Sequence, residues 1–326
     1  MQTLESARAV AVGERLAVRS YAPSDAARWD AFVRAAKNGT FLFTRGYMDH
    51  HASRFRDASS LVFDRERLVA LVPANRDGDE LASHSGLTYG GVVVGPDMTT
   101  PKFVRVFQSL AEAWRRAGVR RVKYKTVPSI YHRLPAEEDR HALFLAGAEL
   151  VRRDVLSVLD LSARPKLEER RRRGQRRAER AGIVVAPSDD LRGFWRVLRE
   201  NLAHRHGVSP VHDEVEIELL RQRFPREIRL YAAHAGPRMV AGVVVYHTGP
   251  VAHAQYIAST RAGREQGALD ACFAWLFREL ASEAAFFDFG SSSEQDGRLL
   301  NAGLVEYKEG FGARTVVHDF YDWRLA

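Results

Sequence analysis

The stretch HAQYIASTRAGREQGALD, residues 253–270, joins a predicted strand to a predicted helix through a turn that contains glycine. Residues 253–259 mix apolar and aromatic side chains, which favour a strand. Apolar residues then recur at three- and four-residue steps through GALDACFAWLFRELASEA, residues 267–284, as in an amphipathic helix. Free N–H groups at such a helix start, with a glycine that permits close approach, suit a pyrophosphate. A plain turn before a helix gives the same pattern, so spacing alone leaves both interpretations open.

This stretch belongs to a pattern that occurs twice in the chain. The hairpin pattern SLVFDRERLVALVPANR, residues 60–76, matches IRLYAAHAGPRMVAGVVVYH, residues 228–247, in which Gly236-Pro237 marks the turn. Each hairpin is followed by a further predicted strand that contains a histidine, ELASHSGLTYGGVVVG, residues 80–95, and PVAHAQYIAST, residues 250–260. His84 and His253 therefore occupy corresponding places in the two halves.

The pattern continues in step after these strands. Each half then has an amphipathic helix, a short strand, a short helix and a last strand. A repeated order of elements indicates two similar domains, and alternating strands and helices indicate layered sheets flanked by helices. We therefore predict an α/β fold (α+β mixed sheets) with two similar domains. The predicted boundaries are an N-terminal domain at 1–160, a basic interdomain helix at 161–186 and a C-terminal domain at 187–326.

The net charge of +8 comes mostly from one segment. Between Arg164 and Arg180 there are nine basic and three acidic residues, which leaves 40 basic and 38 acidic residues elsewhere. Charge confined in this way argues against a long track along a nucleic acid. The run RRRRGQRRAERAG, residues 170–182, predicts a helix that Ser162 caps, with Pro165 in its first turn, and that Gly182 ends. Its stripe with Arg173 and Arg177 is either a phosphate clamp for a small ligand or a solvated linker helix.

Several classes of site and location are disfavoured by what the sequence lacks. No apolar run approaches the ~18 residues of a membrane span, and the first residues have no signal-peptide pattern, so we expect a cytoplasmic location. The single Cys272 lies in a helical pattern, where a buried thiol is expected. His204, His206 and His212 are close in sequence, but without a Cys pair or an HExxH motif we expect no metal.

The motifs together resemble those of the tandem-GNAT, FemAB-like acyltransferases, a branch of the GNAT superfamily associated with surface-glycan amino-sugar N-acylation. The resemblance extends from about Trp29 to Trp323. Besides the stretches above, it depends on FLFTRGYMDHHASRF (41–55), SHSGLTYGG (83–91), HRHGVSPVH (204–212), FDFGSSSEQDG (287–297) and NAGLVEYKEGFGAR (301–314).

The resemblance implies that the second domain binds acyl-CoA as a cosubstrate. The pantetheine arm would lie along the strand at Gln255, Tyr256 and Ile257. The pyrophosphate would contact the turn at Arg264, Gln266, Gly267 and Ala268. The chain departs from the superfamily pattern at Leu269, where a glycine or alanine is usual.

The resemblance also implies an acceptor, the amine of a nucleotide-linked amino sugar, held between the domains. In the first domain its contacts would be Arg45, Tyr47, Thr88 and Tyr89. The basic run would add Arg173 and Arg177, and the segment near the C-terminus would add Lys308. A histidine is the natural base near neutral pH, so His253 and His84 are candidates, although each could equally be a structural histidine. Glu306 is a candidate acid, and a surface ion pair with Lys308 is the alternative.

Two other functions stay open at this point. A Fem-type transferase that takes its acyl group from aminoacyl-tRNA for peptidoglycan bridges shares the resemblance, but little chain is left between the basic run and residue 226 for a helical tRNA-binding arm. A non-enzymatic nucleic-acid-binding module would show steeply salt-dependent binding to generic DNA or RNA. The sequence does not indicate an oligomeric state.

Overall fold

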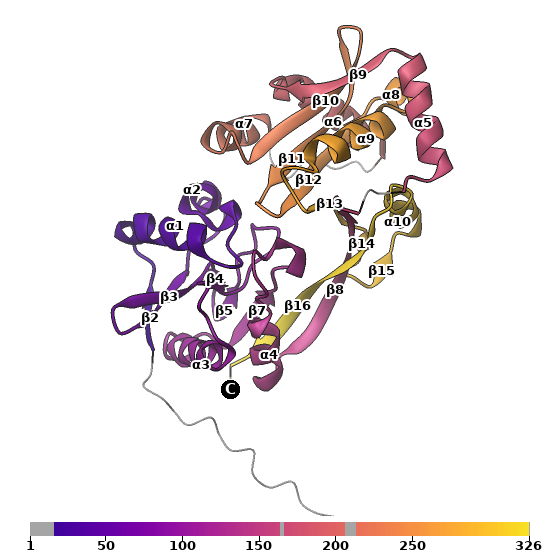
Figure 1. Ribbon diagram of the computed structural model, residues 1–326. Helices are drawn as coiled ribbons and strands as arrows, with labels where there is room; N and C mark the ends of the chain where they lie inside the picture. The colour runs from indigo at the N-terminus through magenta and orange to yellow at the C-terminus, as the bar shows by residue number, and fades with distance from the viewer. Residues whose placement is uncertain (1–15, 164–165, 206–212, 326) are drawn as a thin grey trace, which may run out of the picture. The chain divides into compact units, whose positions relative to one another are not determined.

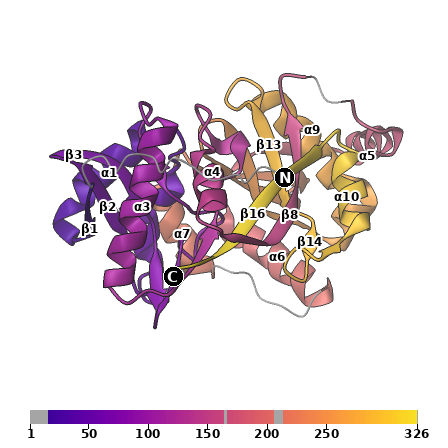
Figure 2. The same cartoon turned by 90° about the horizontal axis from the view of Figure 1, so that it is seen from below.

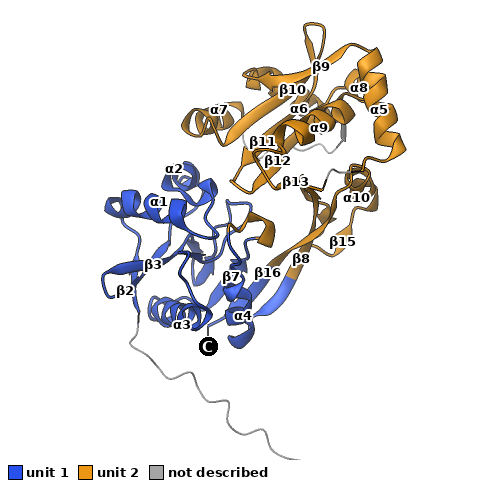
Figure 3. Ribbon diagram, in the orientation of Figure 1, with its two compact units in different colours: residues 1–127, 134–151, 320–326 blue, residues 128–133, 152–319 orange. Residues whose placement is uncertain are grey.

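The structure is a computed structural model that describes residues 16–163, 166–205 and 213–325 (Figure 1). The chain forms two compact units, coloured separately in Figure 3. Unit 1 comprises Met1–Val127, Leu134–Val151 and Phe320–Ala326, and unit 2 comprises Pro128–Arg133 and Arg152–Asp319. Each unit therefore contains segments from both halves of the sequence.

Unit 1 is built on two small sheets and the long helix α3. Its sheets have the strand orders β1-β2-β3-β6 and β4-β5-β7, and the end of β16 pairs with β7. The elements are β1 (Ala17–Ser20), α1 (Ala26–Ala35), α2 (Arg45–Met48), β2 (Ser60–Asp64), β3 (Arg67–Val72), β4 (Asn75–Asp77), β5 (Glu80–Ala82), β6 (Val93–Val94), α3 (Thr100–Arg116), β7 (Arg121–Lys125) and α4 (Glu138–Leu145), with short 3-10 helices at Pro23–Asp25, Phe41–Phe43 and Asp49–His51.

Unit 2 is built on one sheet with the order β8-β13-β12-β11-β10-β9. Helices α9 and α6 lie on opposite faces of this sheet (Figure 2). The elements are the 3-10 helix η4 (Ser129–Tyr131), α5 (Glu169–Arg180), β9 (Ile183–Ser188), α6 (Leu191–Arg205), α7 (Glu214–Arg223), β10 (Ile228–Ala235), β11 (Arg238–His247), β12 (Val251–Ser259), α8 (Arg261–Gln266), α9 (Ala268–Leu280), β13 (Phe286–Ser291), β14 (Ser293–Glu294), β15 (Leu299–Leu300) and α10 (Ala302–Glu309).

The last strand of each half crosses to the other unit. Strand β8 (Glu149–Asp160) ends the first half and pairs antiparallel with β13 of unit 2, as in the pair Leu159↔Phe287. Strand β16 (Arg314–Arg324) ends the second half and pairs antiparallel with β7 of unit 1, as in the pair Tyr321↔Tyr124. The two halves thus exchange their final strands.

Local sequence explains where several elements begin and end. Gly236 has a φ of 56° and forms the two-residue turn between β10 and β11 with Pro237, as predicted. Asp213 accepts a hydrogen bond from the N–H of Glu216 at 2.8 Å, and the Glu216 carboxylate accepts one from the Asp213 N–H at 3.0 Å. This reciprocal capping box satisfies two amide donors at the start of α7.

Each unit has its own apolar core. In unit 1, α3 packs its apolar face on strands β2 and β3 and on the end of β16, where Trp323 stacks on Phe107 with ring centroids 4.3 Å apart. In unit 2, α9 places Phe273 and Leu276 against the strands of the sheet, with Phe287 and Phe311. Cys272 belongs to this core, as predicted, and burial raises the pKa of its thiol to about 12. The predicted fold class, mixed α/β in two domains, is confirmed.

Two local predictions are wrong. The strand predicted over residues 80–95 is interrupted, because only Glu80–Ala82 and Val93–Val94 are strands and the residues between them turn back. The chain returns so close to Ser83 that a side chain at residue 90 would overlap the Ser83 carbonyl, so this turn requires Gly90. The basic helix α5 begins at Glu169 with Glu168 as its N-cap residue, so Ser162 does not cap it. Instead, Ser162 donates to the Asp160 carboxylate, and Pro165 lies outside the described residues.

Candidate active site

Strands β12 and β13 run parallel for only three residue pairs and then separate. The register is Val251↔Phe286, Ala252↔Phe287 and His253↔Asp288. Beyond His253, β12 stays paired with β11 as far as Ser259, while β13 continues beside β8. Among the described residues, the edge of β12 that faced β13 thus has no strand partner from residue 254 onward. We call the His253–Asp288 pair the divergence point.

The two residues of the divergence point are bonded to each other and to a tyrosine. The Asp288 carboxylate oxygen Oδ2 accepts hydrogen bonds from His253 Nδ1 at 2.9 Å and from the Tyr131 hydroxyl at 2.6 Å. Its Oδ1 accepts from the Gly290 N–H at 2.7 Å. An ionised carboxylate can only accept, so His253 carries a proton on Nδ1, and Nε2 is the ring nitrogen that can take up or release a second proton. The His253 side chain is 12% exposed, whereas that of Asp288 is 2% exposed.

The surroundings keep the Asp288 carboxyl ionised. Burial, the largest influence, raises its pKa, but the net shift is downward. The charge of His253 and the hydrogen bonds from His253, Tyr131 and Gly290 together outweigh the burial. An ionised Asp288 orients the imidazole and stabilises it when it becomes protonated, as in other carboxylate–histidine pairs. The pair can therefore act as a general base through His253 Nε2.

Lys308 fixes the segment that follows Asp288. It is buried, and its Nζ donates to the carbonyls of Gly290 at 2.8 Å and Ser291 at 2.9 Å and to Ser292 Oγ at 2.9 Å. All three ammonium protons are thus used inside unit 2. Burial lowers the pKa of Lys308 to about 8, against the opposing charge of Asp288. The geometry makes Lys308 a support for the Gly290 turn, and its predicted role in acceptor binding stays a prediction.

The exposed edge of β12 begins at a bulge. Val244 pairs with Tyr256 and Val245 pairs with Ala254, so Gln255 is the extra residue. The amide oxygen of Gln255 is buried and has no hydrogen-bond partner among the described residues. Tyr256 packs edge-to-face on Trp195 with ring centroids 5.1 Å apart. Bulges commonly re-aim side chains beside active sites, and this one lies two residues beyond the predicted base.

The turn predicted after β12 is largely helical. Thr260 caps α8 by accepting from the Gly263 N–H at 3.0 Å, and Gly267 then adopts a left-handed φ of 77° before α9 begins at Ala268. The exposed Arg264 donates to the Ser259 carbonyl at 2.8 Å. Gln266 is partly buried, and its amide oxygen has no partner among the described residues. The four predicted pyrophosphate residues therefore lie together at the end of the exposed β12 edge.

Helix α5 packs directly on the start of α9. A side chain at Gly267 would overlap the carbonyl of Gly174, and one at Gly174 would overlap the carboxylate of Asp270. Arg171 is buried and donates to Asp270 Oδ1 at 2.9 Å. Gly267 is therefore required for this close helix contact, whatever it contributes to ligand binding. Arg173 and Arg177 lie on the exposed face of α5.

Most of the predicted acceptor residues of the first half are buried in unit 1. The guanidinium of Arg45 is held by the carboxylates of Asp49 and Asp57 and lies 3.8 Å from the centre of the Tyr21 ring. Tyr47 is a core residue, and Tyr89 donates to Thr40 Oγ1 at 3.0 Å. Thr88 is exposed. The acceptor role of these residues stays a prediction.

His84 lies between the two short strands of unit 1 rather than in a strand. Its φ is 60°, and its ring packs against His51 and Phe55. The residues around it fill the space beside β7, since Lys125 Nζ donates to the Leu87 carbonyl at 2.5 Å and the Val92 N–H is 2.9 Å from the Tyr124 hydroxyl. Unit 1 thus has no open strand edge here comparable to that of β12, within the part of the chain that the structure describes.

His84→Asn is expected to reduce the acid sensitivity of the fold. Burial, aided by the charge of Lys125, lowers the pKa of His84 from 6.5 to about 3. Between these values the unfolded chain binds a proton that the folded chain does not, so the free energy of unfolding falls as the pH decreases from 6.5. The contribution is about 3 kcal/mol at pH 4, and asparagine, which tolerates a positive φ, removes it.

Urea denaturation at pH 7 and pH 4 measures this difference. The control is His141→Asn, which changes an exposed histidine in the same unit. Wild type and the His141 variant should lose more stability between the two pH values than His84→Asn does. Equal losses in all three proteins would show that His84 does not cause the acid sensitivity.

Glu306 lies on the exposed face of α10, and its backbone carbonyl accepts hydrogen bonds from Arg170 at 3.3 Å and from the Gly310 N–H at 3.0 Å. The structure thus does not bring Glu306 to the divergence point. No group of three or more potential metal ligands occurs among residues 16–163, 166–205 and 213–325. Over the same ranges no helix is long and apolar enough to cross a membrane.

Sequence reasoning named His253 as a candidate base but did not name Asp288 or Tyr131. Asp288 has a signal in hindsight, since it is the one charged residue in the aromatic strand FFDFG, residues 286–290. A charge in such a strand needs a partner. Tyr131 follows Pro128 in the first half of the chain, and nothing in its neighbourhood indicates that residues 128–133 belong to unit 2.

Comparisons with known proteins agree with this architecture. Residues 165–309 match the family described as acetyltransferase (GNAT) domain. No curated protein matches the sequence significantly. Among solved structures, FemX has a TM-score of 0.66 at 13% identity, covering 94% of this chain and 97% of FemX.

Two further solved structures extend the likeness. The C-terminal domain of a putative lysylphosphatidylglycerol synthetase from Agrobacterium fabrum has a TM-score of 0.62 at 15% identity, covering 92% of each chain. A tandem GNAT protein from the clavulanic acid biosynthesis pathway has a TM-score of 0.51 at 13% identity, covering 96% of this chain and 99% of that one. Residues 165–309 therefore resemble a GNAT acetyltransferase domain, and the fold of the chain is like those of FemX and the tandem GNAT protein.

Proposed function

We propose that the protein is an acyl-CoA-dependent N-acyltransferase and that unit 2 carries its active site. The observation that supports this most is the divergence point itself. An Asp288–His253 pair stands where β12 and β13 separate, at the start of an unpaired strand edge. A thioester whose carbonyl lies at this point has backbone donors on one side and a general base beside it.

The chemistry assigned to these residues is direct acyl transfer. The acceptor amine attacks the thioester carbonyl carbon, and His253 Nε2 takes the proton that the nitrogen loses. The C–S bond then breaks, and the protonated imidazole returns this proton to the leaving thiolate. The Nδ1 proton stays on the imidazole throughout, and Asp288 accepts its hydrogen bond and stabilises the imidazolium. The Tyr131 hydroxyl keeps the carboxylate in position.

The length of the β12 edge suits the donor. From His253 to Ser259 an extended strand covers about 20 Å at ~3.3 Å per residue. We propose that the pantetheine arm lies along Gln255, Tyr256 and Ile257, and that the pyrophosphate lies near Arg264, Gln266, Gly267 and Ala268. Packing of Gly174 on Gly267 restricts the phosphate to the side of the turn that α5 leaves open.

The acceptor is proposed as the amine of a nucleotide-linked amino sugar for surface polysaccharide, by the resemblance of the motifs. The role of the first half as the acceptor side, and the domain boundaries at 160 and 186, are part of the same proposal. A cytoplasmic location is proposed with it, because nucleotide sugars and acyl-CoA are cytoplasmic metabolites.

Titration calorimetry with CoA and acetyl-CoA tests the donor. Both should bind the wild type, and both should still bind His253→Gln, because that residue acts on the acyl group and the amine rather than on the nucleotide. If neither ligand gives binding heat at millimolar concentration, the acyl-CoA assignment is wrong. That result would not bear on the Asp288–His253 geometry.

A second candidate is a transferase that uses aminoacyl-tRNA. The observation in its favour is the row of six exposed arginines on α5, beside the proposed donor site: Arg170, Arg172, Arg173, Arg176, Arg177 and Arg180. Guanidinium groups spaced along a helix suit a phosphate backbone as well as a small diphosphate. The acyl transfer step at His253 would be the same for either donor.

Arg173→Ala combined with Arg177→Ala separates the two donors. If acyl-CoA is the donor, we expect the KM of one phosphate-bearing substrate to rise about tenfold, because one charge-assisted hydrogen bond is lost. The matched control is Arg172→Ala with Arg176→Ala, which removes the same charge but from arginines paired with Glu169. Loss of transfer from aminoacyl-tRNA in the first variant alone would favour the second candidate, and equal kinetics in both variants would leave α5 as a solvated helix.

A further inference from the structure

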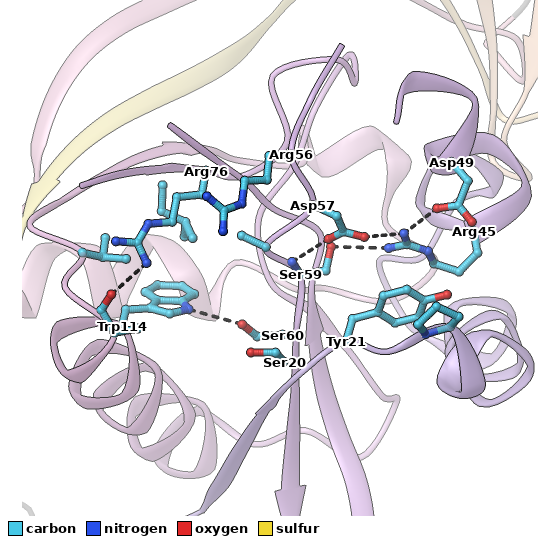
Figure 4. Close-up of a pocket in the computed structure, with 15 residues that line it drawn as sticks. Ser20, Tyr21, Arg45, Asp49, Arg56, Asp57, Ser59, Ser60, Arg76 and Trp114 are labelled. Atoms are coloured by element: carbon cyan, nitrogen blue, oxygen red, sulfur yellow. Dashed lines mark hydrogen bonds and ion pairs between the residues drawn. The ribbon is translucent and has the colours of Figure 1, made fainter. Parts of the chain in front are cut away.

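Unit 1 contains a cavity of about 530 Å³ that is separate from the Asp288–His253 site (Figure 4). Its wall comes from the end of β1, the segment before β2, strand β4 and the C-terminal end of α3. A volume of this size falls within the range of ~300–1,000 Å³ that is usual for small-molecule sites. All the lining residues belong to unit 1, so the cavity is defined by that unit alone.

Two arginines at one end of the cavity have no acidic partner. Arg56 is exposed and has no ion pair among the described residues. Arg76 donates from Nε to the Gly78 carbonyl at 2.7 Å and from Nη1 to the Ala117 carbonyl at 2.8 Å, so neutral groups hold it in place. The backbone N–H of Arg76 donates to the carbonyl of Arg56 at 3.0 Å, which keeps the two residues adjacent. Two uncompensated guanidinium groups in one place attract an anion.

The opposite end of the cavity is also polar, but its charges are compensated. Arg45 is 6% exposed and is bound by Asp49 and Asp57. Its Nε is buried and has no acceptor among the described residues. Asp57 is 36% exposed and can accept hydrogen bonds from ligand hydroxyl groups.

An aromatic ring and small hydroxyl groups also line the cavity. The indole of Trp114 donates to Ser60 Oγ at 3.3 Å, and Ser20 lies beside it (Figure 4). Leu81 and Val119 complete an apolar side. A sugar ring has this combination of faces, with C–H groups that pack on an aromatic ring and hydroxyl groups that bond to serine and aspartate.

A second cavity in unit 1 provides an internal comparison. It measures about 510 Å³ and also has two cations in its wall, Arg67 and Lys102. There each cation is neutralised, because Arg67 pairs with Asp97 at 2.5 Å and Lys102 pairs with Asp64 at 2.8 Å. The two cavities have similar volumes, but only the Arg56–Arg76 cavity offers unpaired positive charge among the described residues.

We infer that the Arg56–Arg76 cavity is a binding site for a small phosphorylated sugar. The phosphate lies between Arg56 and Arg76, and the sugar ring lies over Trp114 with its hydroxyl groups toward Asp57 and Ser60. This site uses residues of unit 1 only and does not use the Asp288–His253 pair, although Arg45 is also one of the predicted acceptor contacts. It binds its ligand whether the donor in unit 2 is acyl-CoA, aminoacyl-tRNA or neither.

Titration calorimetry of the full chain with glucose 1-phosphate, inorganic phosphate and glucose tests the inference. Glucose 1-phosphate should bind best, inorganic phosphate more weakly and glucose not measurably, because the charge contacts contribute most. Arg56→Gln should weaken binding of glucose 1-phosphate about tenfold, the loss of one charge-assisted contact. Arg56 is exposed, so this variant should keep the wild-type melting temperature.

The matched control is Arg67→Gln, which makes the same substitution in the wall of the other cavity and should leave binding unchanged. Arg76→Gln gives a second test, with its melting temperature recorded because Arg76 also bonds the end of α3. Two results would overturn the inference. One is no binding of either phosphate probe at millimolar concentration, and the other is equal binding by Arg56→Gln and the wild type.

Discussion

His253→Gln should lower kcat by about 10²–10⁴-fold, the usual contribution of a general base. Glutamine has nearly the same size and can still bond to Asp288, but it cannot take a proton from the amine. Asp288→Asn should cause a loss of similar size, because a neutral amide neither fixes the tautomer with the proton on Nδ1 nor stabilises the imidazolium. Steady-state kinetics with a fixed amine acceptor and varied acyl donor measure both effects.

The controls separate chemistry from folding. His234→Gln makes the same substitution on β10 of the same unit and should keep wild-type kcat. Tyr131→Phe removes the hydroxyl that donates to Asp288 Oδ2 and lies 3.2 Å from His253 Nδ1, but it leaves His253 in place, so it should shift the pH profile of kcat more than its maximum. If His253→Gln retains its melting temperature and also retains kcat, the general-base assignment is wrong.

The second large effect concerns stability. Arg171→Met should lower the free energy of unfolding of unit 2 by about 3–5 kcal/mol, because it leaves the buried Asp270 carboxylate without its partner. The loss also includes the stacking of the guanidinium on Tyr307, 4.3 Å from the ring centre. Urea denaturation followed by fluorescence measures it.

The pH dependence identifies the cause. Burial raises the pKa of Asp270 even though Arg171 lowers it, so removing Arg171 raises that pKa further. A raised folded-state pKa in an acid means that stability decreases as the pH rises through it. The destabilisation by Arg171→Met should therefore be larger at pH 8 than at pH 5.

Two variants complete this experiment. Arg172→Met alters an exposed neighbour paired with Glu169 and should change stability by less than about 0.5 kcal/mol. Arg171→Met combined with Asp270→Asn removes the stranded charge, so much of the lost stability should return. A double variant as unstable as Arg171→Met alone would place the effect in packing rather than charge.

The order of elements could be predicted from the sequence because it depends on short-range patterns. Both hairpins, both long helices and the strand with His253 are visible as local periodicity. The exchange of β8 and β16 between the units has no local signal, because it depends on which strands pair. For the same reason Tyr131 could not be assigned to the site, whereas His253 could.

The buried arginines show a second limit of sequence reasoning. Arg45 and Arg171 have the residue type of a ligand contact, but each is enclosed by carboxylates and aromatic rings. Asp57 binds Arg45 and Asp270 binds Arg171, and each acid lies outside the helix of its arginine. The periodicity of the sequence does not indicate these pairs. In the sequence, Gly174 is a residue that weakens a helix. In the structure it is needed for packing, because a side chain there would overlap the carboxylate of Asp270.

The exchanged strands have a consequence for how the protein is made. Residues 320–325 complete the core of unit 1, where Trp323 stacks on Phe107. A ribosome delivers this segment only after all of unit 2 has been synthesised. Unit 1 therefore stays incomplete, with α3 partly uncovered, until the end of synthesis, whereas unit 2 can fold before it. Chaperones that bind nascent chains should accordingly stay bound longest to the first half of this protein.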